Sequence, residues 1–314
     1  MSNRFGGMTL YDFERLETYF SFVVERHRVW EQRQQGLPGP WTADPILASR
    51  KFTNVFRVLD PGSQFIFDLE EDDNREERDV LMRLFLYRHT GRVEAWQNLL
   101  VELGDYPRVV DLDTALDAWK DYRSEGNAIF TGAYLVYPQS ATPGSDKLDS
   151  IIALTKRLFD PSSPDDIVPD FLAAQTQRDR FHVLRRNKGV ADFMSMQILT
   201  DWGYTRFGED LEDEFVVPGP GARRGIMQLV VTGNQEAFLR FLHHELLGTD
   251  GVPTLNLGNS VRYPSIMDVQ NTLCEFSKYV RYLDAGKAGK PYIPAHPGVQ
   301  PTPRTPAHWA NTTR

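Results

Sequence analysis

Apolar residues recur at helical spacing along most of the chain. Phe13, Leu16, Phe20 and Val23 fall at intervals of three and four, which places them on one face of a helix that ends before Gly36. The same period predicts further helices over residues 79–89, 92–103, 112–123, 146–159, 189–200, 234–247 and 265–283. Strand-like alternation is rare. The pattern therefore predicts a mainly α fold.

The domain organisation follows from where this pattern stops. No repeat is evident, and no change of composition marks a boundary within the first 285 residues. The last 24 residues contain six of the twenty prolines, and each proline removes a backbone N–H that regular structure would use. We therefore expect one helical domain over residues 1–285, followed by an extended Pro-rich tail over residues 286–314.

Composition excludes several classes of protein. A single cysteine, Cys274, in 314 residues excludes a disulfide framework. His243 and His244 are adjacent and therefore point to different faces of a helix, which argues against a metal site shared by the two. The sequence patterns of phosphate-binding loops, dinucleotide folds and zinc proteases are absent. We therefore expect no metal and no cofactor. No apolar run approaches the roughly 18–20 residues of a membrane span, so we expect no membrane partner.

The charge of the chain is unevenly distributed. The formal net charge is −8, but the acidic runs at 68–79 and 209–214 together carry more negative charge than this total. The rest of the chain therefore has a positive net charge. Basic residues gather over 178–188 and again just after residue 222. Because the local potential steers an anionic ligand, a nucleic acid stays among the expected partners. The alternative interpretation is a set of solvated surface charges.

The segment VVPGPGARRGIMQLVV, residues 216–231, has the Pro-Gly-x-Gly pattern of a helix-hairpin-helix. Gly219 and Gly221 would form a tight turn whose backbone N–H groups bind a DNA phosphate at the start of the next helix. Gly225 would let two helices cross closely. An ordinary loop is the alternative interpretation. The predicted DNA-binding residues are Gly219, Gly221, Arg223, Arg224, Arg185 and Arg186.

A second group of polar residues lies in SIMDVQNTLCEFSKYVRY, residues 265–282. In a helix that begins at Ser265, four polar side chains share one face, opposite Ile266, Leu273 and Phe276. These four are Asp268, Asn271, Glu275 and Lys278. A solvated face with an ion pair is the alternative interpretation.

Four segments, in this order along the chain, carry a resemblance to a known family. They are PWTADPIL at 40–47, FTNVFRVLD at 52–60, VPGPGARRGI at 217–226 and DVQNTLCEFSKYVR at 268–281. From about residue 15 to 285 the chain resembles the alpha-glutamyl/putrescinyl thymine pyrophosphorylases, which share their helical domain with the phage hydroxymethyluracil DNA kinases. The resemblance implies a helical fold similar to that of the helix-hairpin-helix DNA glycosylases.

The resemblance also implies a reaction, the hypermodification of thymine in bacteriophage DNA. A hydroxymethyluracil base that a kinase has pyrophosphorylated would receive an amino acid or amine while pyrophosphate leaves. The implied partners are double-stranded DNA bearing the modified uracil and a free amino acid or amine, in the cytoplasm of an infected bacterial host. The missing phosphate-binding loop fits a transferase that acts after a hydroxymethyluracil DNA kinase.

The residues can be assigned roles in this reaction. The base must leave the DNA stack, and the leaving pyrophosphate needs fixed cations such as Arg57. Asp268 or Glu275 would take the proton of the amine, and the Asn54 amide would pair with the uracil edge. The catalytic candidates are Asp268, Asn271, Glu275 and Lys278, facing the substrate- and pyrophosphate-binding candidates Arg26, Arg28, Asn54 and Arg57. The candidate stacking residues are Trp41, Phe52, Phe56 and Tyr279.

Two other classes of function stay open. A DNA glycosylase would share the fold and the base flipping but would cleave the N-glycosidic bond with an Asp, sometimes helped by a Lys in the hairpin. The hairpin segment carries Arg223 and Arg224 instead of that Lys. A non-catalytic DNA-binding module is the second alternative.

Overall fold

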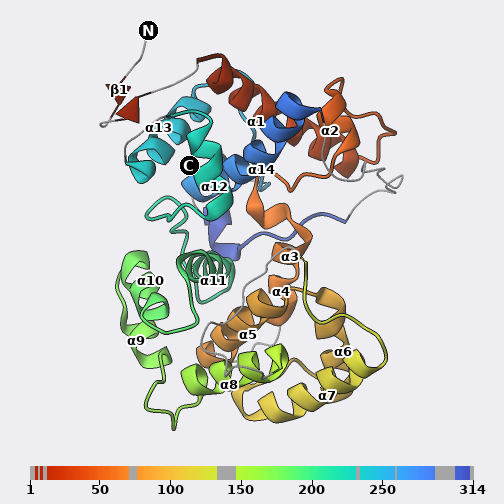
Figure 1. The fold of residues 1–314 in the computed structure, drawn as a ribbon, viewed down its shortest axis with the longest axis vertical. Coiled ribbons are helices and arrows are strands. Elements are labelled where there is room, and N and C mark those ends of the chain that lie inside the picture. Colours follow the sequence, from red (N-terminus) through yellow and green to blue (C-terminus); the bar gives the residue numbers. More distant parts are fainter. Residues whose placement is uncertain are drawn as a thin grey trace. The chain divides into compact units, whose positions relative to one another are not determined.

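The chain is mainly α-helical, as the sequence predicts (Figure 1). The computed structural model describes residues 4–5, 8–9, 13–70, 76–132, 146–230, 234–258, 260–286 and 301–311. Within these residues the strands form only two short antiparallel pairs. They are β1 (Arg4–Phe5) with β2 (Met8–Thr9), and β3 (Leu255–Asn256) with β4 (Val261–Arg262).

The chain divides into two compact units, whereas the sequence analysis expected one helical domain over residues 1–285. Unit 1 consists of Met1–Asp60 and Glu212–Arg314, and unit 2 consists of Pro61–Leu211. Unit 2 is thus inserted between the two parts of unit 1. Because both ends of the chain build the same unit, a search for one linker along the sequence does not find this division.

Unit 1 is organised around one long helix, α14 (Ile266–Ala285), which packs against α1, α2, α12, α13 and a short 3-10 helix, η1. The bounds are α1 Phe13–Gln34, α2 Pro45–Ser49, η1 Arg57–Leu59, α12 Pro220–Met227 and α13 Gln235–Leu247. Its core is aromatic: the Tyr19 and Phe276 rings meet edge to face at 5.2 Å between centroids, and both are fully buried. The α14 face opposite the predicted polar face is therefore a core face, as expected.

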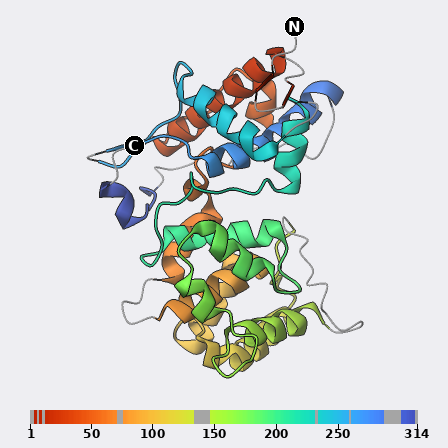
Figure 2. The same cartoon turned by 90° about the vertical axis from the view of Figure 1, so that its left-hand side faces the viewer.

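Unit 2 is a group of helices (Figure 2). They are α3 (Pro61–Gln64), α4 (Ile66–Leu69), α5 (Glu77–Thr90), α6 (Val93–Leu103), η2 (Val109–Asp111), α7 (Leu112–Ser124), α8 (Lys147–Phe159), α9 (Val168–Ala173), α10 (Gln177–Arg185) and α11 (Asp192–Tyr204). Helix α5 is buried over most of its length, including two arginines. Arg83 donates to the carbonyl oxygens of Leu69, Tyr106 and Pro107, and Arg88 pairs with Asp201. These partners satisfy charges that would otherwise destabilise the core.

The described part of the Pro-rich tail packs on unit 1, in contrast to the extended tail that the sequence predicts. Residues 301–311 include the 3-10 helix η3 (Ala307–Asn311). The Trp309 ring is 2% exposed and lies 3.6 Å from the Arg262 guanidinium carbon, and Gln34 Nε2 donates to Pro301 O at 2.8 Å. One buried indole thus anchors a segment whose prolines prevent longer helices.

Candidate functional site

The glycine-rich segment begins a helix where the sequence predicts one. Helix α12 starts at Pro220, with Gly219 as its N-cap. The preceding helix, α11, ends at Tyr204, and residues 205–219, all of them described, contain no helix. The helix-hairpin-helix is therefore not confirmed, because no second helix directly precedes the turn.

The glycines of this segment face α14. A Cβ atom added to Gly221 would overlap Cys274 Sγ and lie 3.1 Å from Cys274 Cβ. At Gly225 it would overlap the Leu273 carbonyl oxygen and lie 2.8 Å from the carbonyl carbon. The predicted close crossing at Gly225 is therefore present, and its partner is α14. The Gly219 N–H donates to Gln270 Oε1 at 3.0 Å, so this predicted phosphate donor has a partner within the protein.

The predicted DNA-binding arginines divide between the two units. Arg223 and Arg224 are exposed on α12, where Arg223 Nε also donates to Pro218 O at 2.9 Å. Arg185 and Arg186 belong to unit 2, and each forms an exposed ion pair, with Asp192 and Asp170 respectively. DNA binding by these residues stays a prediction.

Asp268 caps α14 and connects it to η1. Its Oδ2 accepts the Ser265 N–H at 2.9 Å and the Ser265 hydroxyl at 3.0 Å, and its Oδ1 accepts the Arg57 N–H at 2.8 Å. Burial raises the pKa of Asp268, while these hydrogen bonds oppose that shift. Because both oxygens already accept backbone donors, Glu275 is the better placed of the two predicted bases.

The two polar motifs do meet. Asn271 Nδ2 donates to Asn54 O at 3.5 Å across 217 positions of sequence. Lys278 Nζ donates to Lys51 O and lies 4.5 Å from the centroid of the Phe52 ring. The structure thus brings one face of α14 against the segment 51–54, as the sequence analysis expects.

Arg26 of α1 holds this segment from its other side. Its Nε donates to Thr53 O, and its Nη2 donates to Asn54 O and, at 3.1 Å, to Thr53 Oγ1. Arg26 is 4% exposed, and burial lowers the pKa of its guanidinium. The negative charges of nearby Glu275 and Asp60 act in the opposite direction and raise that pKa. Arg26 is therefore a buried cation with two carboxylates near it.

The carboxylates of Glu275 and Asp60 have different hydrogen-bond and ion-pair partners. Glu275 is 14% exposed and pairs with Lys278 at 3.3 Å. Asp60 accepts the Asn54 N–H at 2.8 Å, and burial raises its pKa to about 6. Asp60 is not among the residues that the sequence predicts for the site. Its place as the last residue of FTNVFRVLD was the available signal.

Arg57 and Arg28 have different surroundings from Arg26. Arg57 is 4% exposed within η1, and its backbone N–H is the donor to Asp268 described above. Arg28 is exposed, pairs with Glu25 at 3.4 Å and lines a second, more open pocket together with Tyr279. Two positions along a helix differ by about 200° in direction, which explains why Arg26 and Arg28 line different pockets.

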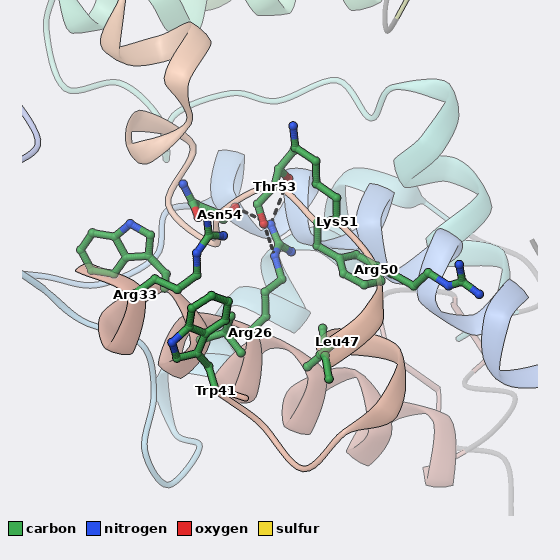
Figure 3. Close-up of a pocket in the computed structure, with 12 residues that line it drawn as sticks. Arg26, Arg33, Trp41, Leu47, Arg50, Lys51, Thr53 and Asn54 are labelled. Carbon is green, nitrogen blue, oxygen red and sulfur yellow. Dashed lines mark hydrogen bonds between the residues drawn. The ribbon is translucent and has the colours of Figure 1, made fainter. Parts of the chain in front are cut away.

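A pocket lies between α1 and the segment 41–54 (Figure 3). The space between its lining residues amounts to about 480 Å³ when the opening to solvent is included. The residues that line it are Arg26, Val29, Trp30, Arg33, Trp41, Leu47, Ala48, Arg50, Lys51, Phe52, Thr53 and Asn54. Four of these are cationic and three aromatic, and none of the described lining residues is acidic. Of the candidate stacking residues, Trp41 and Phe52 line this pocket, whereas Phe56 is a fully buried core residue.

The described residues also bear on metal sites and membrane-spanning helices. Among the described residues, no group of three or more His, Cys, Asp or Glu side chains is placed to hold a metal ion. Over the same residues, no helix has the length and apolar character to span a membrane.

The fold and the site define a mainly helical protein with a cationic, aromatic pocket, one of whose lining residues, Arg26, has two carboxylates near it. Comparison with known proteins places it further: the chain belongs to the family described as the helical domain of 5-hmdU DNA kinases, whose model matches residues 14–287. A relative named 5-hmdU DNA kinase, from Bacillus phage SP10, is 28% identical over 239 residues. The match covers 70% of this chain and 36% of the relative, so the chain spans about a third of the relative's length. No solved structure matches the chain.

Proposed function

We propose that this protein is a DNA-modifying transferase of the phage thymine hypermodification pathway. It acts on a 5-pyrophosphoryloxymethyluracil base flipped out of double-stranded DNA, and it replaces the pyrophosphate by an amino acid or amine. It works after a hydroxymethyluracil DNA kinase, in the cytoplasm of the infected host. The observation that carries this proposal is the meeting of residues 51–60 with one face of α14, which gathers cations and carboxylates in one place.

The family supports the pathway, and the sequence supports the reaction type. The relative from phage SP10 is named a kinase, but a kinase of the phosphate-binding-loop type needs a GxxxxGK[ST] segment, and this chain contains none. Cations beside carboxylates suit a different task. The cations bind the departing diphosphate, and a carboxylate accepts the proton of an attacking amine.

In the proposed reaction the amine nitrogen attacks the exocyclic CH₂ carbon of the base. A C–N bond forms, the C–O bond to the diphosphate breaks, and pyrophosphate leaves with the bonding electron pair. Glu275 takes the proton from the amine, because it is partly exposed and, unlike Asp268, pairs with a side chain, that of Lys278, and not with backbone N–H groups. Arg26 and Lys278 provide positive charge near the leaving group. Arg28 is left out of this set because it faces elsewhere.

The test uses the full chain and DNA that contains pyrophosphoryloxymethyluracil, with a mixture of amino acids and amines. Mass spectrometry of the digested nucleosides should reveal a new adduct and the nucleophile that was used. An abasic site would instead identify a glycosylase, and unchanged DNA with retained binding would identify a non-catalytic module. Either result would overturn the proposal.

Glu275→Gln tests the assigned base. Removing a general base lowers a rate by about a hundredfold or more, so transfer should fall by that factor while DNA affinity stays unchanged. Asp284→Asn is the matched control, because Asp284 lies on the same helix, is exposed and pairs with Arg15 at 2.7 Å. Equal rates for the two variants would remove Glu275 from the mechanism.

A further inference from the structure

The pocket between α1 and the segment 41–54 contains a buried cation with unused binding capacity. Arg26 lines this pocket. Its Nε and Nη2 atoms donate to Thr53 and Asn54, whereas Nη1 is buried and has no hydrogen-bond partner. A buried donor without an acceptor is costly and rare in folded proteins. An anionic ligand would supply the acceptor that the protein does not.

The same face of α1 adds a second cation and an aromatic wall. Arg26, Trp30 and Arg33 lie at intervals of four and three, so all three point to this pocket. The Arg33 guanidinium carbon lies 5.3 Å from the centroid of the Trp41 ring, and the two side chains lie beside each other in Figure 3. The Trp30 ring stacks on His27 at 5.3 Å with an interplanar angle of 19°. The rings are thus held in place before any ligand arrives.

The charge within the pocket has one sign. Lys51 is exposed and also lines the pocket, while Arg50 points away from Arg26 in Figure 3 and lies 4.7 Å from the Tyr282 ring. The carboxylates near Arg26, those of Glu275 and Asp60, are not among the lining residues. Arg26, Arg33 and Lys51 therefore produce a positive potential that no lining carboxylate offsets.

We propose that this pocket binds a diphosphate group joined to a flat ring. Arg26 and Arg33 hold the phosphoryl oxygens, because guanidinium groups donate paired hydrogen bonds to such oxygens. Trp30 and Trp41 provide faces on which the ring stacks. This inference deepens the proposed function and rests on it for the biological ligand, but the binding itself can be measured without any transfer reaction.

The first experiment is calorimetric titration of the full protein with inorganic pyrophosphate. Pyrophosphate should bind, and Arg33→Gln should weaken its binding by about tenfold or more, because hydrogen bonds between a guanidinium and a phosphoryl oxygen are charge-assisted and stronger than neutral ones. Arg28→Gln is the matched control: it removes the same charge from the same helix but lies outside the pocket. Circular dichroism and thermal melting establish that both variants fold.

The second experiment tests the ring by comparing deoxyuridine 5′-diphosphate with pyrophosphate. The nucleotide should bind more tightly than pyrophosphate, and Trp30→Leu should remove that advantage while leaving pyrophosphate affinity intact. Absence of pyrophosphate binding at millimolar concentration, or equal weakening by Arg33→Gln and Arg28→Gln, would overturn the diphosphate site. Equal affinity for the two ligands would overturn the ring site. A protein that binds pyrophosphate here but forms no adduct retains the pocket and loses the transferase proposal.

Discussion

The close packing of α12 on α14 makes a quantitative prediction at Gly225. An alanine there would place its Cβ 2.8 Å from the carbonyl carbon of Leu273, against 3.4–4 Å for ordinary contact. The helices must then separate locally by at least about 0.6 Å, and overpacking of this kind costs about 1–3 kcal/mol, more against rigid backbone. Alanine regains about 1 kcal/mol of helix propensity. Because the obstacle at Gly225 is the Leu273 backbone, the cost lies at the upper end of that range, about 3 kcal/mol, so Gly225→Ala should lower the free energy of unfolding by about 2 kcal/mol.

Gly221 supplies the matched comparison, because its nearest neighbour is a side chain. A Cβ at Gly221 would overlap Cys274 Sγ, and without that sulfur the nearest atom is Cys274 Cβ at 3.1 Å. Cys274→Ala should therefore recover most of the stability that Gly221→Ala loses, but none of the loss in Gly225→Ala.

Urea unfolding followed by circular dichroism compares the wild type with the three single variants and with the two double variants that add Cys274→Ala to Gly221→Ala or to Gly225→Ala. Hydrogen exchange in α12 and α14 locates the effect. A Gly225→Ala protein as stable as the wild type would show that the two helices are further apart than described. Identical behaviour of the two double variants would refute the assignment of the sulfur as the obstacle at Gly221.

Three further predictions concern Asp268, Asp60 and the tail. Asp268→Asn should lower the free energy of unfolding by about 1–3 kcal/mol, because it disturbs buried hydrogen bonds; unchanged urea midpoints would contradict this. Burial raises the pKa of Asp60 from 3.8 to about 6, so the folded state binds this proton more tightly than the unfolded state. The resulting contribution to the free energy of unfolding is fully present below pH 3.8 and is lost as the pH rises through 6. The stability of Asp60→Asn relative to wild type should thus rise by up to about 3 kcal/mol from pH 4 to pH 7, and a difference independent of pH would refute the shift. Deleting residues 301–314 should destabilise unit 1 by about 2 kcal/mol or more, because Trp309 is 2% exposed; an unchanged melting temperature would show that this contact contributes little.

The helices that the sequence predicts best are those with a broad apolar face and a clear N-cap. The predicted segments 146–159 and 234–247 correspond to Lys147–Phe159 and Gln235–Leu247, and Asp146 and Asn234 cap them through their side chains. Helix α10 was not predicted. In QRDRFHVLR only Phe181 and Leu184 are buried apolar residues, and two residues are too few to establish a period.

The helical period predicts which side chains of the candidate site share a face of one helix, but it does not identify the distant segments that they contact. The helical period correctly placed Asn271 and Lys278 on one face of α14, and both contact the segment 51–54. The same period could have separated Arg26 from Arg28. By contrast, the role of Gly221 in packing depends on Cys274, a residue from a distant segment, and no local pattern around the glycine names that partner.

At Asp268 the predicted placement is found, and the structure adds a capping role that the predicted catalytic role did not include. Asp268 lies on the predicted polar face and contacts the other motif, as expected, but it does so through the Arg57 N–H and the Ser265 cap. A serine three positions before an acidic residue is itself a capping signal, and it was available in the sequence. Because one carboxylate both begins α14 and fixes η1, changing Asp268 would move Asn54 and Arg57 relative to Glu275. Under the proposed function, loss of activity in an Asp268 variant would therefore report on the position of the site. Only substitutions at Glu275, which caps no helix, would report on the proposed proton transfer.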